Sequence, residues 1–140
     1  MTLETIAVAR KRSYPPRVSA FTQPFWEGLA TGKWQSTCCD ACGKFTFPPK
    51  PVCPHCWSDA MKWKDLSKRG TLYSWTRIHA APKVFTDEAP YTVCIVDLDI
   101  GLRIATRMVE EPGVDFKPGI PMEVVVLKFE DGPLFASRPA

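Results

Sequence analysis

Two pairs of cysteines constrain the fold of this chain more than any other feature of its sequence. Cys39 and Cys42 form one C-x-x-C pair, and Cys53 and Cys56 form a second pair after ten intervening residues. Each pair closes a tight turn that can direct two thiolates toward the same ion, so the spacing predicts one tetrahedral metal site. Thiolates favour zinc, with iron as the alternative. Because four protein ligands leave no open position, we expect a structural rather than a catalytic metal.

Cys38 and Cys94 are the remaining cysteines, and neither has an obvious partner. Cys38 offers a competing register, Cys38-x-x-x-Cys42, for the first half of the site. A secreted disulfide scaffold is the alternative explanation for six cysteines, but the paired spacing favours a metal site in a reducing compartment. No apolar core follows the basic residues 10–12, so we do not expect a secretory signal, and we predict a cytoplasmic protein without a membrane span.

Proline and glycine divide the N-terminal third of the chain. Tyr14 precedes Pro15 and Pro16, which disfavour helix, so residues 1–20 are expected to form an extended arm. This arm is either a disordered tail or a segment that lies along a partner. A helix is predicted within residues 21–33, with Thr22 as its N-cap and Gly32 as its stop. Its apolar stripe packs either on its own domain or against another subunit, and consists of Phe25, Trp26, Leu29 and Ala30.

The rest of the chain reads as short strands. Residues 34–66 contain the metal site, with short strands at residues 44–47 and 61–63 flanking it. Residues 67–140 alternate apolar and polar side chains with the period of half-buried strands. Five such runs are expected, at residues 72–78, 92–100, 102–108, 122–129 and 134–137. Five short strands in a segment of this length predict a mainly β fold with an OB-type barrel, and a small sandwich is the alternative.

The sequence contains no Ser-His-Asp pattern, phosphate-binding loop or close carboxylate pair, and we expect no catalytic residues. Asp87 and Glu88 are expected to be solvated in a loop. Binding of single-stranded nucleic acid is one alternative function, because a basic and aromatic face could form from Tyr73, Trp75, Arg77, Arg103 and Arg107. A net charge of +3 is a weak electrostatic basis for it. A redox protein with iron in the four-cysteine site is a further alternative.

Several motifs occur in an order that resembles one known family. The predicted helix reads Pro-Phe-Trp-Glu-Gly-Leu from Pro24, and Phe47-Pro48-Pro49-Lys50-Pro51 lies between the cysteine pairs. Residues 70–75 read Gly-Thr-Leu-Tyr-Ser-Trp, and Pro90-Tyr91 opens a strand that ends at residues 99–101. Over about residues 21–136 the chain resembles the acyl-CoA-associated zinc-ribbon/OB-fold family, first catalogued as domain of unknown function 35. Trp57 departs from the glycine that is common in the family after the second cysteine pair.

The resemblance implies a helix, a rubredoxin-like zinc ribbon over residues 34–66 and an OB-fold domain over residues 67–140. It also implies one structural zinc ion and a role as a small, non-catalytic subunit of a thiolase-like acyl-CoA enzyme, either an acyl-CoA C-acyltransferase or a thiolytic enzyme. An enoyl-CoA hydratase or an aldolase is the alternative partner. In such a hetero-oligomer the catalytic subunit holds most of the acyl-CoA.

On this basis we assign two groups of candidate contact residues. Tyr14, Phe25, Trp26 and Leu29 are predicted to form the partner interface. The loop over residues 80–91 is predicted to reach toward the acyl-CoA of the partner, with Lys83 and Tyr91 close to the CoA.

Overall fold

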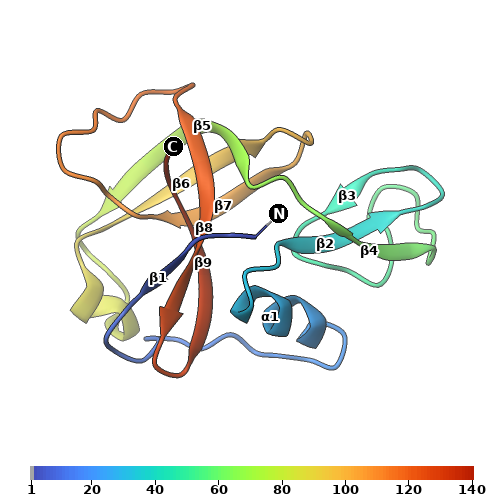
Figure 1. The fold of residues 1–140 in the computed structure, drawn as a ribbon, viewed down its shortest axis with the longest axis horizontal. Helices are drawn as coiled ribbons and strands as arrows, with labels where there is room; N and C mark the ends of the chain where they lie inside the picture. Colours follow the sequence, from blue (N-terminus) through green and yellow to red (C-terminus); the bar gives the residue numbers. More distant parts are fainter. Residues whose placement is uncertain (1) are drawn as a thin grey trace.

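A computed structural model describes residues 2–140 of the chain and is mainly β, with one short α-helix (Figure 1). Met1, the first residue of the predicted arm, lies outside the described residues. In chain order the elements are β1 (Thr5–Ala7), α1 (Gln23–Ala30), β2 (Gln35–Cys39), β3 (Phe45–Thr46), β4 (Met61–Asp65), β5 (Arg69–Ile78), the 3-10 helix η1 (Lys83–Glu88), β6 (Tyr91–Leu98), β7 (Arg103–Met108), β8 (Pro121–Phe129) and β9 (Gly132–Pro139).

Strands β5 to β9 close into a barrel. Strand β5 pairs antiparallel with β6 and β8, β6 with β7, and β8 with β9. A short parallel pairing of β7 with β9, Arg107 with Ala136 and Met108 with Ser137, completes the circle. Closure leaves no long unpaired strand edge within the barrel. The predicted five-stranded OB-type barrel is therefore confirmed over the sandwich.

Alternation of side chains positions the core of the barrel. In β6 the residues Thr92, Cys94, Val96 and Leu98 are buried, as the two-residue period predicted. Ile100, the last residue of the predicted strand over residues 92–100, is exposed because the chain has already turned toward β7. All five predicted strands are therefore present in the barrel, and they differ from the observed ones at their ends, since β5 begins at Arg69 and β9 spans Gly132–Pro139.

The N-terminal arm belongs to the chain's own fold. Strand β1 pairs in parallel with residues 126–128 of β8, while residues 121–123 of β8 pair with β5. The arm thus pairs with the part of the β8 edge that β5 does not pair with. Further along, Arg12 donates its backbone N–H to Oδ1 of Asp131 at 2.8 Å, and its guanidinium donates to the carbonyl oxygens of Asp131 and Pro133. These bonds do not fit the disordered-tail interpretation of the arm.

Helix α1 begins and ends close to the predicted residues. Gly32 adopts φ of +87° and donates its N–H to the carbonyl of Leu29, which makes it the predicted stop. Thr22 occupies the N-cap position, but its side chain does not cap the helix. Its Oγ1 instead accepts a hydrogen bond from the backbone N–H of Ser19 at 2.9 Å. The predicted side-chain cap at Thr22 is therefore wrong.

A cluster of aromatic rings joins α1, the ribbon and the barrel. The rings of Phe25, Trp34, Phe47 and Phe135 lie with centroids between 5.3 and 6.1 Å apart. Phe25 is 2% exposed and Leu29 is fully buried. Both were predicted to contact a partner, and that part of the prediction is corrected because they pack in the chain's own core. Trp26 is partly buried at the edge of the same core.

The ribbon is a three-stranded antiparallel sheet with β2 between β3 and β4, and it lies beside the barrel (Figure 1). Strand β2 is fully buried although it is polar. Ser36 donates its hydroxyl to the carbonyl of Thr46, and Thr37 Oγ1 both donates to and accepts from the backbone of Lys50. Because these hydroxyls have partners, their burial carries little cost, and an apolar periodicity could not reveal the strand.

Candidate metal centre

The four cysteines come from two equivalent turns at one end of the ribbon. Cys39 ends β2 and Cys42 lies in the turn that follows, while Cys53 and Cys56 lie between β3 and β4. In each turn the residue after the second cysteine donates its N–H to the carbonyl of the first. These bonds run from Gly43 to Cys39 at 2.7 Å and from Trp57 to Cys53 at 2.9 Å. The two turns therefore have the same hydrogen-bonded form and point their sulfur atoms toward each other.

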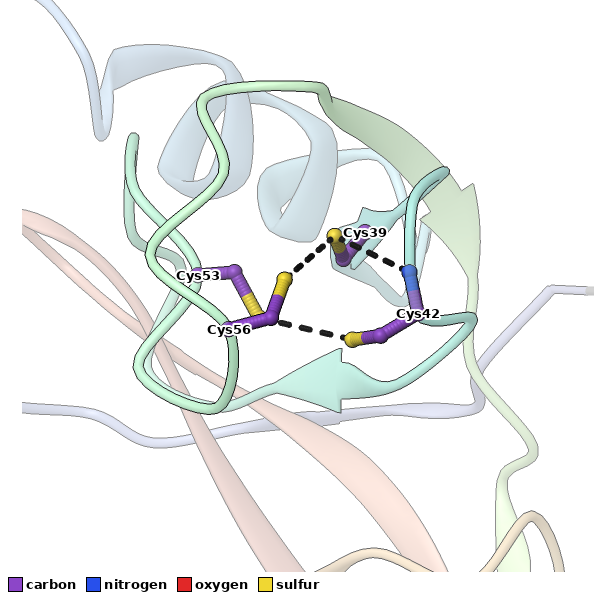
Figure 2. A group of neighbouring side chains, drawn as sticks. All are labelled: Cys39, Cys42, Cys53 and Cys56. Carbon is purple, nitrogen blue, oxygen red and sulfur yellow. Dashed lines mark hydrogen bonds between the residues drawn. The ribbon is translucent and has the colours of Figure 1, made fainter.

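The sulfur atoms have the spacing of a tetrahedral thiolate site (Figure 2). All four Sγ atoms lie within 4.8 Å of one another, and Cys39–Cys56 and Cys42–Cys53 are each separated by 3.6 Å. A zinc ion with four sulfur ligands at about 2.3 Å requires sulfur–sulfur distances of about 3.8 Å. The donor set and its geometry thus fit a single metal ion with four protein ligands.

Backbone N–H groups support negative charge on the sulfurs. Cys42 donates its N–H to Sγ of Cys39, and His55 donates its N–H to Sγ of Cys53, both at 3.4 Å. The N–H of Cys42 is the main cause that lowers the pKa of Cys39. Burial acts to raise the pKa of Cys53, but the N–H groups of His55 and Cys56 outweigh it and lower that pKa to about 7. One thiol of each turn, that of Cys39 or Cys53, therefore has a lowered pKa and loses its proton more readily.

The other two thiols hold their protons more tightly. The N–H of Ser58 acts to lower the pKa of Cys56, but burial and the neighbouring sulfurs outweigh it and raise that pKa to about 12. The pKa of Cys42 is also raised, because burial and its contacts with Cys53 and Cys39 outweigh the N–H of Lys44. Four thiolates at these distances would repel one another strongly, so full deprotonation requires a cation among them.

The neighbours of the four ligands lie outside the site. Cys38 points its Sγ toward the carbonyl oxygen of Gly43 at 3.6 Å, so the competing register through Cys38 is not the one that the geometry favours. The side chain of His55 lines a cleft with Lys44 and Ile100, between the ribbon and the turn from β6 to β7.

Trp57 has the conformation that a glycine would favour. Its φ of +66° is close to the +76° of Gly43 at the equivalent position of the first turn. Its side chain is 82% exposed. Tryptophan in place of glycine at this position therefore leaves the form of the turn unchanged, and the indole does not pack in the core.

Several of the predicted contact residues come together around η1. The exposed Tyr14 and the partly buried Tyr91 both lie near Phe85, with ring centroids 6.5 and 6.1 Å from it. The guanidinium of Arg107 stacks on the ring of Tyr91 at 3.9 Å. Lys83 is exposed at the start of η1. The residues predicted at the core of the interface, Phe25 and Leu29, do not join this group.

Glu88 is a buried ion-pair partner that the sequence did not predict. Its side chain is 8% exposed and accepts hydrogen bonds from Arg10 at 2.8 Å and Arg107 at 3.0 Å. Burial acts to raise its pKa, but the hydroxyl of Ser13 and the two guanidinium groups outweigh burial and lower that pKa. The prediction that Glu88 is solvated is therefore wrong, and this residue ties the arm to the barrel.

The basic residues of the barrel face carry their own counterions. Arg103 pairs with Asp97 at 2.6 Å, Arg77 with Glu110 at 2.7 Å, and Arg107 with Glu88. Arg103 also stacks on Tyr73, 3.7 Å from the ring centroid. A nucleic-acid strand would have to replace these internal carboxylates, so the arrangement weakens the nucleic-acid alternative.

The helix, the four-cysteine ribbon and the closed barrel together define a zinc-ribbon protein with an OB fold. Sequence profiles of two adjacent domains match it: the ChsH2 rubredoxin-like zinc ribbon domain over residues 26–62 and the ChsH2 C-terminal OB-fold domain over residues 63–127. A DUF35 domain-containing scaffold protein of Methanocaldococcus jannaschii is 34% identical over 96 residues, which are 67% of this chain and 68% of that protein. The chain belongs to the DUF35 family, as its motifs predicted.

Two further similarities involve subunits of named enzymes. The benzoylsuccinyl-CoA thiolase subunit BbsA of Thauera aromatica is 29% identical over 107 residues, 74% of this chain and 73% of that subunit. The solved structure of the Ltp2-ChsH2(DUF35) aldolase superposes with a TM-score of 0.75 at 27% identity, covering 89% of this chain and 98% of that one. Within residues 2–140, no helix has the length and apolar character to cross a membrane.

Proposed function

We propose that this chain is a non-catalytic, zinc-binding subunit of a thiolase-like acyl-CoA enzyme. The observation that carries the proposal is the similarity to a thiolase subunit along nearly three quarters of both chains. The four-cysteine site supports it, because a metal with four protein ligands has no position for a substrate. In this role the partner performs Claisen-type bond formation or cleavage on a thioester, and this chain stabilises the partner and shapes its acyl-CoA channel.

An aldolase partner is the second candidate. The similarity to the DUF35 chain of the Ltp2-ChsH2 aldolase supports it, since that superposition covers nearly the whole of the compared chain. A hydratase partner is a further form of the same proposal. All three partners require the same accessory role and differ in the chemistry of the catalytic subunit.

We place the contact with the catalytic subunit on the exposed surface around η1. Tyr14 belongs to this surface and is exposed, whereas Trp26, the other predicted interface residue that retains exposed area, lies on α1 against Phe135. Lys83 would offer its ammonium group to a CoA phosphate held by the partner, and Tyr91 lies across the same short helix.

We assign zinc to the metal site, with one ion per chain, because four thiolates without an open position are typical of structural zinc. Metal analysis of the purified chain should give one zinc per chain and a colourless protein. Iron in place of zinc, with visible thiolate absorbance, would identify a redox site instead.

Co-purification tests the proposed function. The tagged chain is purified from its native cells, and the proteins bound to it are identified by mass spectrometry. A stoichiometric thiolase-like subunit whose activity depends on this chain is the expected result, and an aldolase or hydratase subunit would select the second candidate. Recovery of the chain alone, beside a candidate subunit with unchanged activity, would refute the accessory role.

A further inference from the structure

Trp57 has a backbone conformation that its own side chain disfavours. Among residues 2–140 it is the single non-glycine residue with positive φ. In the left-handed region the Cβ atom crowds the following carbonyl, so that a bulky residue is rare there. Strained residues of this kind are retained where something other than the local fold requires the side chain.

The first cysteine turn shows what the fold requires at this position. Gly43 occupies the equivalent place, makes the equivalent hydrogen bond, and has open space where a Cβ would stand. The turn therefore requires only a residue that can adopt positive φ, and glycine meets this requirement. Trp57 forms the same turn with the largest side chain available, so its indole has no evident role in forming the metal site.

Nor does the indole stabilise the folded chain by burial. At 82% exposure it is the most exposed of the large hydrophobic side chains within the described part of the chain. It lies outside the hydrophobic core cluster and outside the partly buried residues that pack on that cluster. The strained backbone and the exposed indole of Trp57 therefore cost folding free energy, and no contact within the chain offsets that cost.

The surroundings of Trp57 match the centre of a protein interface. Residues 51–58 contain no lysine, arginine, aspartate or glutamate, with His55 as the one basic side chain, and all of residues 51–57 except Cys53 are exposed. Cys53 donates its N–H to the carbonyl of Ser58 across the turn, and Val52 in the same segment is also exposed. Interface centres are depleted in charge, and tryptophan is enriched among the residues that dominate binding energy. A turn clamped by a metal presents such an anchor in one fixed conformation, which lowers the entropy lost on binding.

We propose that the second cysteine turn, residues 51–58, is a docking surface for the catalytic subunit, with Trp57 as its anchor in an apolar pocket of that subunit. The inference rests on the proposed function and adds to it a second contact surface, besides the one around η1, and the residue that anchors it. The exposed indole of Trp57 and the absence of lysine, arginine, aspartate and glutamate from the turn favour a partner site that is apolar. A nucleic acid is a poor occupant because the turn offers no lysine or arginine to its phosphates.

Binding of Trp57→Gly to the purified catalytic subunit from the co-purified complex tests the inference. Glycine removes the indole and relieves the strained φ. We expect affinity to fall by at least about 30-fold, as for a dominant interface residue. The melting temperature should stay equal or rise, and zinc should remain at one per chain. Trp57→Phe should retain most of the affinity. Tyr73→Ala is the control, because Tyr73 is an aromatic residue that is 52% exposed on the barrel, and its affinity should match the wild type.

Three outcomes would overturn the inference. These are a Trp57→Gly variant that binds as tightly as the wild type, one that loses zinc or melts earlier, and a Tyr73→Ala variant that is weakened to the same extent. A wild-type chain that captures no acyl-CoA enzyme subunit, or that pairs only with a second copy of itself, refutes the proposed function and this inference with it. If the wild-type chain binds the catalytic subunit and Trp57→Gly binds it equally tightly, only the inference is refuted.

Discussion

Single residues of the ribbon divide into those that hold the metal and those that lie beside it. Cys53 has the more acidic thiol of its turn, with a pKa of about 7, and Cys38 bonds to a carbonyl outside the site. We predict that Cys53→Ser reduces the zinc content by roughly ten-fold or more, since one thiolate ligand is lost. Cys38→Ser should retain one zinc per chain. Metal analysis by mass spectrometry measures both, and loss of zinc from Cys38→Ser instead would restore the competing register.

Glu88 makes the stability of the chain depend on acid pH. Its pKa is lowered in the folded state from the ordinary 4.5, so its contribution is fully present above that value and is lost as pH falls through the folded pKa. We predict that Glu88→Gln lowers the unfolding free energy at pH 7 by about 1–2 kcal/mol, as expected for hydrogen bonds to a buried charge. The difference between variant and wild type should shrink below pH 4.5.

Thermal melting of both proteins between pH 3 and 7 checks this prediction. The exposed Glu111 provides a matched control, because it lies in the loop between β7 and β8. Glu111→Gln should follow the wild-type curve at every pH. A Glu88→Gln curve that runs parallel to the wild type down to pH 3 would show that the carboxylate contributes no pH-dependent stability.

How far the sequence could predict these residues depends on how local their partners are. The grouping of the four cysteines around one point could be predicted, because a C-x-x-C turn encodes its own geometry within four residues. The burial and ion pairing of Glu88 could not be predicted, since Arg10 lies 78 residues away in the sequence and pairs with Glu88 only once the arm has docked. At Trp57 the unusual residue was visible, but its positive φ was not, because a tryptophan gives no signal of that conformation.

Among the elements, α1 links the two halves of the molecule. Phe25 projects from it into the aromatic cluster that contains Trp34 and Phe47 of the ribbon and Phe135 of β9. We predict that Phe25→Ala destabilises the chain by about 3–5 kcal/mol, because it leaves a cavity between well-packed rings. Trp26→Ala should cost clearly less, since Trp26 is only partly buried. Urea denaturation measures both. A Phe25→Ala variant that folds normally but loses its partner would reinstate Phe25 as an interface residue.

Predictability of the elements also follows from their chemistry. The barrel strands from β5 to β9 could be predicted because alternate residues are apolar, and β6 buries every second side chain. Strand β2 was missed because its hydroxyls are satisfied by backbone partners rather than replaced by apolar groups. Strand β1 was missed because three residues that pair with a strand more than 100 residues away carry no local signal. The interface assignment of Phe25 and Leu29 failed because an amphipathic helix does not reveal which surface covers its stripe.

In the whole molecule the metal centre and the barrel share one core. Trp34 donates its indole N–H to the carbonyl of Ser67 at the start of the barrel, and its ring packs on Phe135. Apolar residues of the ribbon such as Trp34 and Phe47 pack in the same core cluster as those of the barrel, so the metal and this shared cluster replace the separate core that so small a unit lacks. Loosening of the ribbon would therefore uncover Phe25 and Phe135 as well, and the two parts are expected to unfold together.

Metal removal tests this coupling. We predict that the zinc-bound chain unfolds in one transition, with coincident melting curves from circular dichroism and tryptophan fluorescence. After chelation the midpoint should fall by about 10 °C or more, which corresponds to roughly 3 kcal/mol for a chain of this size. The four thiols then lack the cation that their spacing requires, and the ribbon no longer supports Trp34 and Phe47. Zinc added back should restore the midpoint, whereas magnesium should not. A barrel transition that keeps its midpoint after chelation would show that the ribbon folds independently of the barrel, and that the shared aromatic cluster does not transmit the stability of the metal centre.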